Sequence, residues 1–328
     1  MNILFTNYCN LKCDYCFAKG TLGGSEYTKK SYISLDNLKI ALNFLKNSKQ
    51  TRVGVIGGEP TLHPEFEKAF KTILDKGHEI LLYSNGMIRK SVLAYLSKIK
   101  KEKWGMLLNV NIPQSYSKKE WSIINETMDT LSDKIGLGHT ICRPDFRGDF
   151  IIKLIKKYRL IKCVRLGMAA PICGHKNLYL SFNGHKKAAS RVVKFAQKCN
   201  LLDIYISFDC GFLLCSFTEK EIGRLFYYNV PLTCTCTPVI DVGPDLMIWR
   251  CFATSMIWQK NLKDFKNLEE IYSFYVNKFK PFKKSGILKK CFRCKYLQRG
   301  QCVGGCLGHT LKSFNVEKTN LLRRPDFS

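Results

Sequence analysis

Short apolar runs alternate with amphipathic stretches over the first two thirds of the chain. β-Strands are predicted at residues 2–6, 52–56, 79–84, 106–112, 135–141 and 164–169. Ser34 is expected to cap a helix whose inner face holds Leu35, Leu38, Leu42 and Leu45. Further helices are predicted from Pro64 to Gly77 and near residues 89–99, 150–158 and 187–197.

Strands that alternate with helices indicate a parallel sheet with right-handed crossovers. We therefore expect an α/β fold in which six strands form a curved, partly closed (β/α)6 barrel. The loops at the carboxyl ends of such strands are where a functional site is expected.

The pattern changes after about residue 201. One more strand is predicted at 203–208, and beyond it helical periodicity is weak except at 268–276. The region is rich in cysteine, at positions 210, 215, 234, 236, 251, 291, 294, 302 and 306. These features predict two domains, a barrel at 1–205 and a small Cys-rich iron–sulfur domain at 206–328, in which clusters substitute for a large core.

Composition narrows the class of protein. The 328 residues contain 45% hydrophobic side chains and 16 cysteines. An apolar run of about 18 residues, as a membrane span requires, is absent, and so is a signal-peptide pattern. We therefore expect a cytoplasmic protein without a membrane partner. In that reducing compartment, clustered cysteines indicate metal binding more than disulfides, whereas scattered Cys142, Cys163, Cys173 and Cys199 are expected to be small buried side chains.

The net charge of +27 has two interpretations. A lysine-rich, solvated surface would produce it, and so would a surface that binds an acidic partner. One segment stands out, because residues 271–316 include no Asp or Glu. Its basic residues could offset the negative charge of a cluster bound by four thiolates. They crowd together at Lys278, Lys280, Lys283, Lys284, Lys289, Lys290, Arg293 and Lys295.

The first motif whose residues could bind a metal is the loop after the first predicted strand. Cys9, Cys13 and Cys16 follow one another at spacings of four and three. Three thiolates can bind three corners of a four-iron cubane and leave one iron open for a ligand. A zinc knuckle is the alternative, and the position at the end of a strand favours the cluster.

The cysteine motif resembles the signature of the radical S-adenosylmethionine (SAM) superfamily. The resemblance implies a 4Fe-4S cluster whose open iron binds the methionine moiety of SAM. Reductive cleavage of SAM then yields a 5′-deoxyadenosyl radical that abstracts hydrogen from a substrate. It also implies a place near the adenine for Tyr15, and an electron donor such as flavodoxin or ferredoxin.

Further turns match this resemblance. Gly57-Gly58-Glu59-Pro60 follows the second strand and resembles the superfamily's methionine-binding turn, in which glycines allow close backbone approach. Glu59 would accept hydrogen bonds from the ammonium group of the methionine moiety. Ser84 and Asn85 begin a Ser-Asn-Gly turn that the family places near the cofactor, although Asn-Gly is also a common turn dipeptide.

Two strand positions are weaker candidates. Asn109, with Asn111, ends the fourth strand, where relatives place polar groups near the ribose. Arg165 lies on the sixth strand, where relatives often have an Arg that reaches the methionine carboxylate. Ordinary surface polarity would explain these residues equally well.

The C-terminal cysteines resemble the SPASM extension of radical enzymes that modify peptides and proteins. There the cysteines bind one or two auxiliary 4Fe-4S clusters. The resemblance implies one cluster on Cys236, Cys251 and Cys306, and another on Cys291, Cys294 and Cys302. A structural zinc ribbon is the alternative.

Two departures from the SPASM pattern leave ligands open. The spacing between Cys294 and Cys302 is seven residues where the family usually has five, and no cysteine follows Cys306. The second cluster therefore lacks an obvious fourth ligand, for which His309, Asp326 or an open iron are candidates. The fourth ligand of the first cluster is open among Cys234, Cys210 and Cys215.

The expected function is therefore that of a radical SAM enzyme acting on a peptide or protein substrate, for which acidic character would match the basic segment. Phe252 stands where sulfatase-maturing relatives have an Asp, which argues against that activity. No leader-binding domain is expected before Cys9, and no catalytic acid or base is predicted. The alternatives are a radical enzyme for RNA or a small metabolite, although nucleic acid is not the expected partner, and a non-enzymatic zinc-binding regulator.

Overall fold

A computed structural model describes residues 1–19, 31–209, 211–232, 234, 236–237 and 239–313. Ten strands in this part of the chain form a single sheet in the order β10-β9-β8-β1-β2-β3-β4-β5-β6-β7. The strands are β1 (Asn2–Leu4), β2 (Arg52–Ile56), β3 (Glu79–Ser84), β4 (Trp104–Asn109), β5 (Ile135–Ile141), β6 (Cys163–Met168), β7 (Tyr205–Phe208), β8 (Ile240–Val242), β9 (Met247–Arg250) and β10 (Lys260–Asn261). The helices are α1 (Leu35–Asn47), α2 (Phe66–Asp75), α3 (Lys90–Ser97), α4 (Lys118–Thr130), α5 (Asp149–Tyr158), α6 (Phe182–Asn200), α7 (Glu219–Tyr227), α8 (Leu268–Ser285), α9 (Lys295–Gln298) and α10 (Leu307–Ser313).

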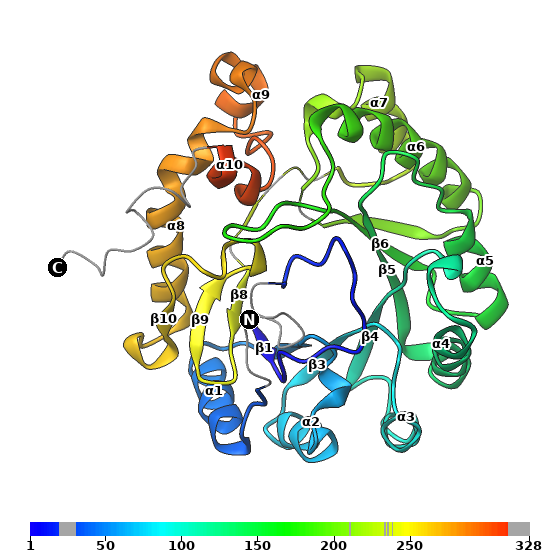
Figure 1. The fold of residues 1–328 in the computed structure, drawn as a ribbon, viewed down its shortest axis with the longest axis vertical. Helices are drawn as coiled ribbons and strands as arrows, with labels where there is room; N and C mark the ends of the chain where they lie inside the picture. Colours follow the sequence, from blue (N-terminus) through cyan, green and yellow to red (C-terminus); the bar gives the residue numbers. More distant parts are fainter. Residues whose placement is uncertain (20–30, 210, 233, 235, 238, 314–328) are drawn as a thin grey trace.

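The strands β1 to β7 are parallel, and each pairs with the next one along the chain. Figure 1 shows the sheet curving around a central region, with helices α1 to α6 on its outer side. This arrangement confirms the predicted α/β partial barrel. One continuous core, which includes Leu42, Phe70, Ile124 and Val192, packs the helices onto the outer face of the sheet.

Individual boundaries differ from the prediction. β1 ends at Leu4, and β4 runs from Trp104 to Asn109, earlier than the predicted 106–112. β7 pairs with β6 as a seventh parallel strand, so the predicted domain boundary after residue 205 falls inside this strand. The barrel sheet therefore extends at least to Phe208.

Helix α1 forms where the sequence predicts it. The Ser34 side chain accepts a hydrogen bond from the backbone N–H of Asn37 at 3.1 Å, which caps the helix. Leu38, Leu42 and Leu45 are fully buried against the sheet. Helix α2 likewise ends just before Gly77, whose φ of +84° suits glycine.

The C-terminal region extends the same sheet. β8 pairs in parallel with β1, and β8, β9 and β10 form antiparallel pairs. Helix α8 packs against this extension, where the Tyr275 hydroxyl donates to the carbonyl of Ile248 at 2.9 Å. Figure 1 shows α8 beside β9 and β10, with α9 and α10 at its far end. None of the helices in the described ranges is long and apolar enough to cross a membrane.

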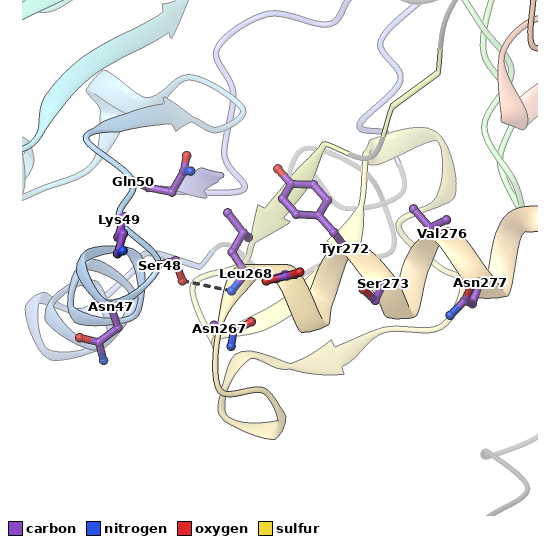
Figure 2. Close-up of a pocket in the computed structure, with 11 residues that line it drawn as sticks. Asn47, Ser48, Lys49, Gln50, Asn267, Leu268, Tyr272, Ser273, Val276 and Asn277 are labelled. Atoms are coloured by element: carbon purple, nitrogen blue, oxygen red, sulfur yellow. Dashed lines mark hydrogen bonds between the residues drawn. The ribbon is translucent and has the colours of Figure 1, made fainter. Parts of the chain in front are cut away.

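A surface cleft of about 660 Å³ lies at the other end of the barrel from the predicted site. Figure 2 shows it between the end of α1 and the start of α8, where the backbone N–H of Leu268 donates to the Ser48 hydroxyl at 3.1 Å. Residues 47–50 lead into the first residue of β2, so the cleft lies near the amino ends of the strands. In barrels of parallel strands the chemistry takes place at the carboxyl ends, and this cleft is therefore not the candidate active site.

Candidate active site

The three N-terminal cysteines lie together in the loop after β1. Each is partly exposed, and the backbone N–H of Cys16 donates to the carbonyl of Cys13 at 3.1 Å. Burial, followed by the negative charges of Glu59, Cys16 and Cys13, raises the pKa of the Cys9 thiol to about 12. Burial and the charge of Cys13 raise the pKa of Cys16 to about 11. The loop therefore gathers three thiols into one electrostatically coupled group.

The turn after β2 holds this loop through its backbone. The N–H of Gly58 donates to the carbonyl of Thr6 at 2.9 Å, and the N–H of Glu59 donates to the carbonyl of Tyr8 at 2.8 Å. A Cβ atom on Gly58 would overlap the Tyr8 carbonyl, and one on Gly57 would lie 2.8 Å from the Thr6 oxygen. The glycines thus allow the turn to approach the cysteine loop; contact of Gly57, Gly58 and Pro60 with SAM stays a prediction.

Glu59 has a structural role that the sequence analysis missed. Its side chain is fully buried and accepts hydrogen bonds from the Thr61 hydroxyl at 2.7 Å, the Ser84 hydroxyl at 3.0 Å and the Asn85 N–H at 2.8 Å. Burial raises the pKa of this carboxyl, although these hydrogen bonds act in the opposite direction. Glu59 therefore joins the turns after β2 and β3, and its contact with a SAM ammonium group stays a prediction.

Asn85 connects the turn after β3 with the cysteine loop. Its side-chain N–H donates to Asn10 Oδ1 at 2.8 Å and lies 3.7 Å from the Cys9 sulfur. The structure thus places Ser84 and Asn85 beside the predicted cluster site. Contact of either residue with the cofactor stays a prediction.

Tyr15 and Asn111 form a second link to the cysteines. The Tyr15 hydroxyl donates to Asn111 Oδ1, and Asn111 Nδ2 lies 3.7 Å from the Cys13 sulfur. Burial raises the pKa of the Tyr15 phenol well above its usual value. Asn111 therefore supports the cysteine loop, whereas Asn109 is exposed and faces Gly138 on β5.

Arg165 already has an acidic partner. Its guanidinium forms an ion pair with Asp209 at 2.9 Å and donates to the Tyr83 hydroxyl at 3.2 Å. Tyr83 lies on β3 and Arg165 on β6, so this bond spans the concave side of the sheet. A methionine carboxylate would have to share this arginine with Asp209. The sequence analysis missed Asp209, although its position directly after a predicted strand could have indicated it.

Glycines alternate with buried residues on three central strands. Gly105, Gly136, Gly138 and Gly167 occupy positions between side chains, such as Met106, Leu137 and Leu166, that pack into the outer core. They therefore face the same concave side as Tyr83 and Arg165. Small residues on this face leave the polar side chains of the site accessible.

The first C-terminal group consists of Cys236, Cys251 and Cys306. Burial raises the pKa of the Cys306 thiol, and the charges of Cys236 and Cys251 raise it further. The buried Arg250 donates to the Cys236 sulfur at 3.3 Å, and Lys283 donates to the Cys236 carbonyl at 2.6 Å. The structure therefore brings together three cysteines that the SPASM resemblance assigned to one cluster, with two basic side chains beside Cys236.

This first group lies against the mouth of the barrel. Cys306 packs with Ala170, which follows β6, and with Ala253. The N–H of Cys173 donates to the carbonyl of Ala253 at 3.1 Å. The buried Phe252 contacts Phe17 of the cysteine loop, with ring centroids 5.5 Å apart. The N-terminal cysteine loop and the first C-terminal group therefore share one end of the sheet.

The second C-terminal group contains Cys291, Cys294 and Cys302, as predicted, together with Cys215 and Cys234. Burial raises the pKa of Cys215, to which the charges of Cys302, Cys291 and Cys294 add. Burial and the charges of Cys302 and Cys215 raise the pKa of Cys234 to about 12.

The other candidate ligands have different surroundings. The N–H of His309 donates to the carbonyl of Cys306 at 3.0 Å, which places this residue beside the first group. Cys210 and Asp326, also considered as ligands, lie outside the described residues.

The donor sets are chemically suited to iron–sulfur clusters, because all three groups consist of cysteines and thiolates are the ligands that hold such clusters. Within the described ranges, no three His, Cys, Asp or Glu side chains form a site for a single metal ion. The presence of clusters stays a prediction.

Comparison with known protein families matches the first part of the chain. Residues 3–159, a little less than half of the chain, match the model of the Radical SAM superfamily. That segment contains the cysteine loop and the turns after β2 and β3, which the geometry brings together. The chain therefore carries a radical SAM domain over this segment, and proteins with this domain are enzymes. The match argues against the alternative of a non-enzymatic zinc-binding regulator.

The fold likeness extends over the C-terminal region. Streptococcus suis SuiB bound to precursor peptide SuiA superimposes with a TM-score of 0.68 at 15% identity, covering 95% of this chain and 72% of that one. Native anSMEcpe with bound AdoMet gives a TM-score of 0.67 at 18% identity, covering 96% of this chain and 94% of that one. Both likenesses cover the barrel and the C-terminal region, so this chain shares its fold with these two proteins over nearly its whole length. The iron–sulfur character of the C-terminal region stays a prediction.

Sequence similarity to curated proteins is confined to part of the chain. GTP 3′,8-cyclase of Pasteurella multocida is 30% identical over 98 residues, which are 29% of this chain and 28% of the cyclase. 7-Carboxy-7-deazaguanine synthase of Thermoplasma acidophilum is 33% identical over 84 residues, 25% of this chain and 36% of the synthase. The matched segment thus spans only about a third of either relative.

Proposed function

We propose that this radical SAM enzyme modifies a peptide or protein by abstracting a hydrogen atom from it. The observation that supports this substrate class most strongly is the first C-terminal cysteine group at the barrel mouth, in contact with Ala170 and joined to the cysteine loop through Phe252. A SPASM-like region with auxiliary clusters at that position would form one wall of the substrate site.

Each part of the site would have a distinct task. Cys9, Cys13 and Cys16 would hold the radical cluster, and Asn85 and Asn111 would orient its thiolates. SAM would bind along the turns after β2 and β3, with Tyr15, Asn109 and Arg165 at its edges. When bound, the cluster and SAM supply the reductive cleavage that generates the 5′-deoxyadenosyl radical.

The C-terminal groups would hold two auxiliary 4Fe-4S clusters. Arg250 and Lys283 beside Cys236 would offset the negative charge of the first. A donor such as flavodoxin or ferredoxin would supply the electron for SAM cleavage.

A peptide substrate is supported by two further observations. The fold resembles that of SuiB bound to its precursor peptide and of anSMEcpe with AdoMet and the Kp18Cys peptide. In addition, the net charge of +27 and the absence of Asp and Glu from residues 271–316 would favour an acidic peptide.

A small-molecule substrate is the second candidate. GTP 3′,8-cyclase and 7-carboxy-7-deazaguanine synthase are among the curated relatives. Their similarity covers 29% and 25% of this chain, however. That length is less than the barrel alone, so it favours a shared SAM site more than a shared substrate.

Product formation can separate these candidates. The anaerobically reconstituted enzyme is incubated with SAM, dithionite and either GTP or a deuterated acidic test peptide that contains Cys and aromatic residues. We expect deuterium to appear in 5′-deoxyadenosine with the peptide only, together with a mass change in that peptide. Deuterium-free 5′-deoxyadenosine with the peptide and conversion of GTP would overturn the proposal. The Cys9/Cys13/Cys16→Ala variant is the control for background cleavage.

A further inference from the structure

We infer that Cys215 supplies the fourth thiolate of the second C-terminal cluster, next to Cys291, Cys294 and Cys302. The inference rests on the proposed presence of auxiliary clusters. The SPASM pattern takes this ligand from a cysteine after the position of Cys306, where this sequence has none. Cys215 would take its place from the turn that follows β7, far upstream of the other three ligands.

The backbone places this turn beside the C-terminal cysteine loop. Cys215 lies in the 3₁₀ turn η4 (Leu214–Ser216). Immediately before it, Leu213 packs against Gly305, where a Cβ atom would lie 2.8 Å from Leu213 Cδ2. The next segment along the chain makes a second connection, because the N–H of Val303 donates to the carbonyl of Cys234 at 3.2 Å. Two upstream segments therefore flank the loop that contains Cys302.

The loop itself is packed closely enough to fix its cysteines. Gly286 has a φ of +65°, and a Cβ atom on it would lie 2.8 Å from the Cys291 sulfur. Gly304 has a φ of +75°, and a Cβ atom on it would overlap Gly286. The N–H of Gly304 points at the Cys302 sulfur at 3.4 Å. Cys291 and Cys302 are thus held in position next to a backbone donor that would stabilise a cluster thiolate.

The surroundings distinguish Cys215 from Cys234. The thiols of Cys302, Cys291 and Cys294 all lie near enough to Cys215 to act on it electrostatically. Around Cys234, the corresponding neighbours are Cys302 and Cys215. We therefore assign Cys215 to the cluster, because Cys234 has fewer of the predicted ligands among its neighbours and because the Leu213 contact places the turn of Cys215 beside the loop.

The charge distribution fits a cluster with four thiolates. Such a cluster is anionic, and Lys290, which directly precedes Cys291 in the sequence, brings a positive charge close to Cys215. The Lys290 ammonium also lies over the ring of Phe182, 4.9 Å from its centroid, which holds it near the barrel side of the group. A positive charge therefore lies beside this cysteine group, where it would offset the charge of the cluster.

Four-thiolate ligation has a functional consequence. A cluster whose four irons all bind protein thiolates has no open position for a substrate atom. The second group would therefore transfer electrons or stabilise the fold, and direct substrate contact would fall to the first group at the barrel mouth.

The test uses the full chain with Cys9, Cys13 and Cys16 replaced by Ala, so that only C-terminal clusters contribute. Iron and sulfide content, Mössbauer spectra and EPR spectra are compared for this background and with Cys215→Ala, Cys215→Ser, Cys234→Ala or, as a positive control for a predicted ligand, Cys291→Ala added. Cys163→Ala, a half-buried cysteine on β6 outside both groups, is the matched control. We expect about eight irons in the background.

The Cys215→Ala change should remove about four of these irons or convert one cluster to a three-iron form. Cys215→Ser should keep the iron but shift the EPR spectrum, because oxygen replaces sulfur at one iron, whereas Cys234→Ala and Cys163→Ala should match the background. If Cys215→Ala leaves iron content and spectra unchanged while Cys291→Ala does not, the assignment of Cys215 is wrong and the clusters stand. A background without iron would instead overturn the proposed auxiliary clusters, and this inference with them.

Discussion

The cysteine loop after β1 and the cysteine groups of the C-terminal region are assembled in opposite ways. Cys9, Cys13 and Cys16 are close in sequence, and Gly58 and Glu59 bind their loop through backbone hydrogen bonds at the rim of a sheet. The second C-terminal group combines residues from position 215 to position 302, held by turns and short helices.

This difference separates two functions of a bound cluster. At the barrel rim the sheet and these backbone hydrogen bonds position the loop, so the cluster would add chemistry to a site that the protein fold already defines. In the C-terminal region the cluster would itself connect segments distant in sequence, and its binding energy would contribute to folding. Loss of iron should therefore have different effects on the two regions.

The largest expected effect is on catalysis. Replacement of Cys9, Cys13 and Cys16 by Ala should abolish SAM cleavage and remove about four irons per chain. The free energy of unfolding should fall by no more than about 3 kcal/mol, because Cys9 and Cys16 pack only at the edge of a small cluster around Leu4 and Ile56 and lie outside the main barrel core. Anaerobic cleavage assays and urea denaturation of variant and wild type measure both quantities. A collapse of stability would show that the loop is not preformed.

Iron removal should loosen the C-terminal region selectively. Amide exchange at Ile287 and Val303, which donate to Gly304 and Cys234, should become about tenfold faster or more in iron-free protein. Exchange in β2 and β3 should stay unchanged. Hydrogen–deuterium exchange with mass spectrometry measures this directly. Equal protection with and without iron would mean that the C-terminal packing does not depend on clusters.

The junction of the two regions should respond to pH through Asp241 on β8. This side chain is buried and accepts a hydrogen bond from Asn2 at 2.7 Å; burial raises its pKa to about 7. Because its unfolded pKa is about 3.9, the unfolded state loses this proton first, and stability should fall as pH rises from about 4 to 7.

Asp241→Asn should remove this pH dependence of the free energy of unfolding. Relative to wild type, the free energy of unfolding of the variant should therefore rise by up to roughly 4 kcal/mol between pH 4 and 7. Denaturation at a series of pH values tests it. Asp245→Asn, at an exposed position two residues before Met247, is the control and should retain the wild-type slope. A parallel pH dependence in Asp241→Asn and wild type would contradict the assignment.

A smaller effect on stability should separate crowding from backbone strain in the C-terminal loop that contains Cys302. Gly304→Ala combines a positive φ with an overlap against Gly286, whereas Gly300→Ala has a similar φ of +70° and open space around it. Gly304→Ala should therefore be less stable than Gly300→Ala by about 1–3 kcal/mol. Thermal unfolding of the iron-loaded variants compares them. Equal losses of stability in the two variants would mean that the close packing of this loop does not contribute to the free energy of unfolding.

Local sequence patterns predicted the parallel strands and helix α1, because the hydrophobic period of an element and its helix-capping residues depend only on residues that are close in sequence. Helices α4 and α7 were missed since their exposed faces are polar and few of their side chains are buried. Their capping boxes, Ser117 with Glu120 and Thr218 with Glu221, are visible in the sequence and could have indicated them.

Contacts between distant segments could not be predicted in the same way. The motif spacing gave the three members of the first C-terminal group, and the structure placed them together. The same spacing left Cys215 ambiguous, because its neighbours lie more than seventy residues away. Likewise, the ion pair of Arg165 with Asp209 depends on the register of β6 and β7, which no local pattern specifies.

The position of β1 between β2 and β8 also constrains how the chain reaches its final state during synthesis. Asn2 bonds to Asp241, 239 positions further along the chain. Until the ribosome has released residue 242, one edge of this short apolar strand lacks its partner and can pair with other chains. A fragment that ends before β8 should therefore aggregate although it contains every cysteine of the radical cluster, and expression of the barrel alone would be a poor route to a working enzyme.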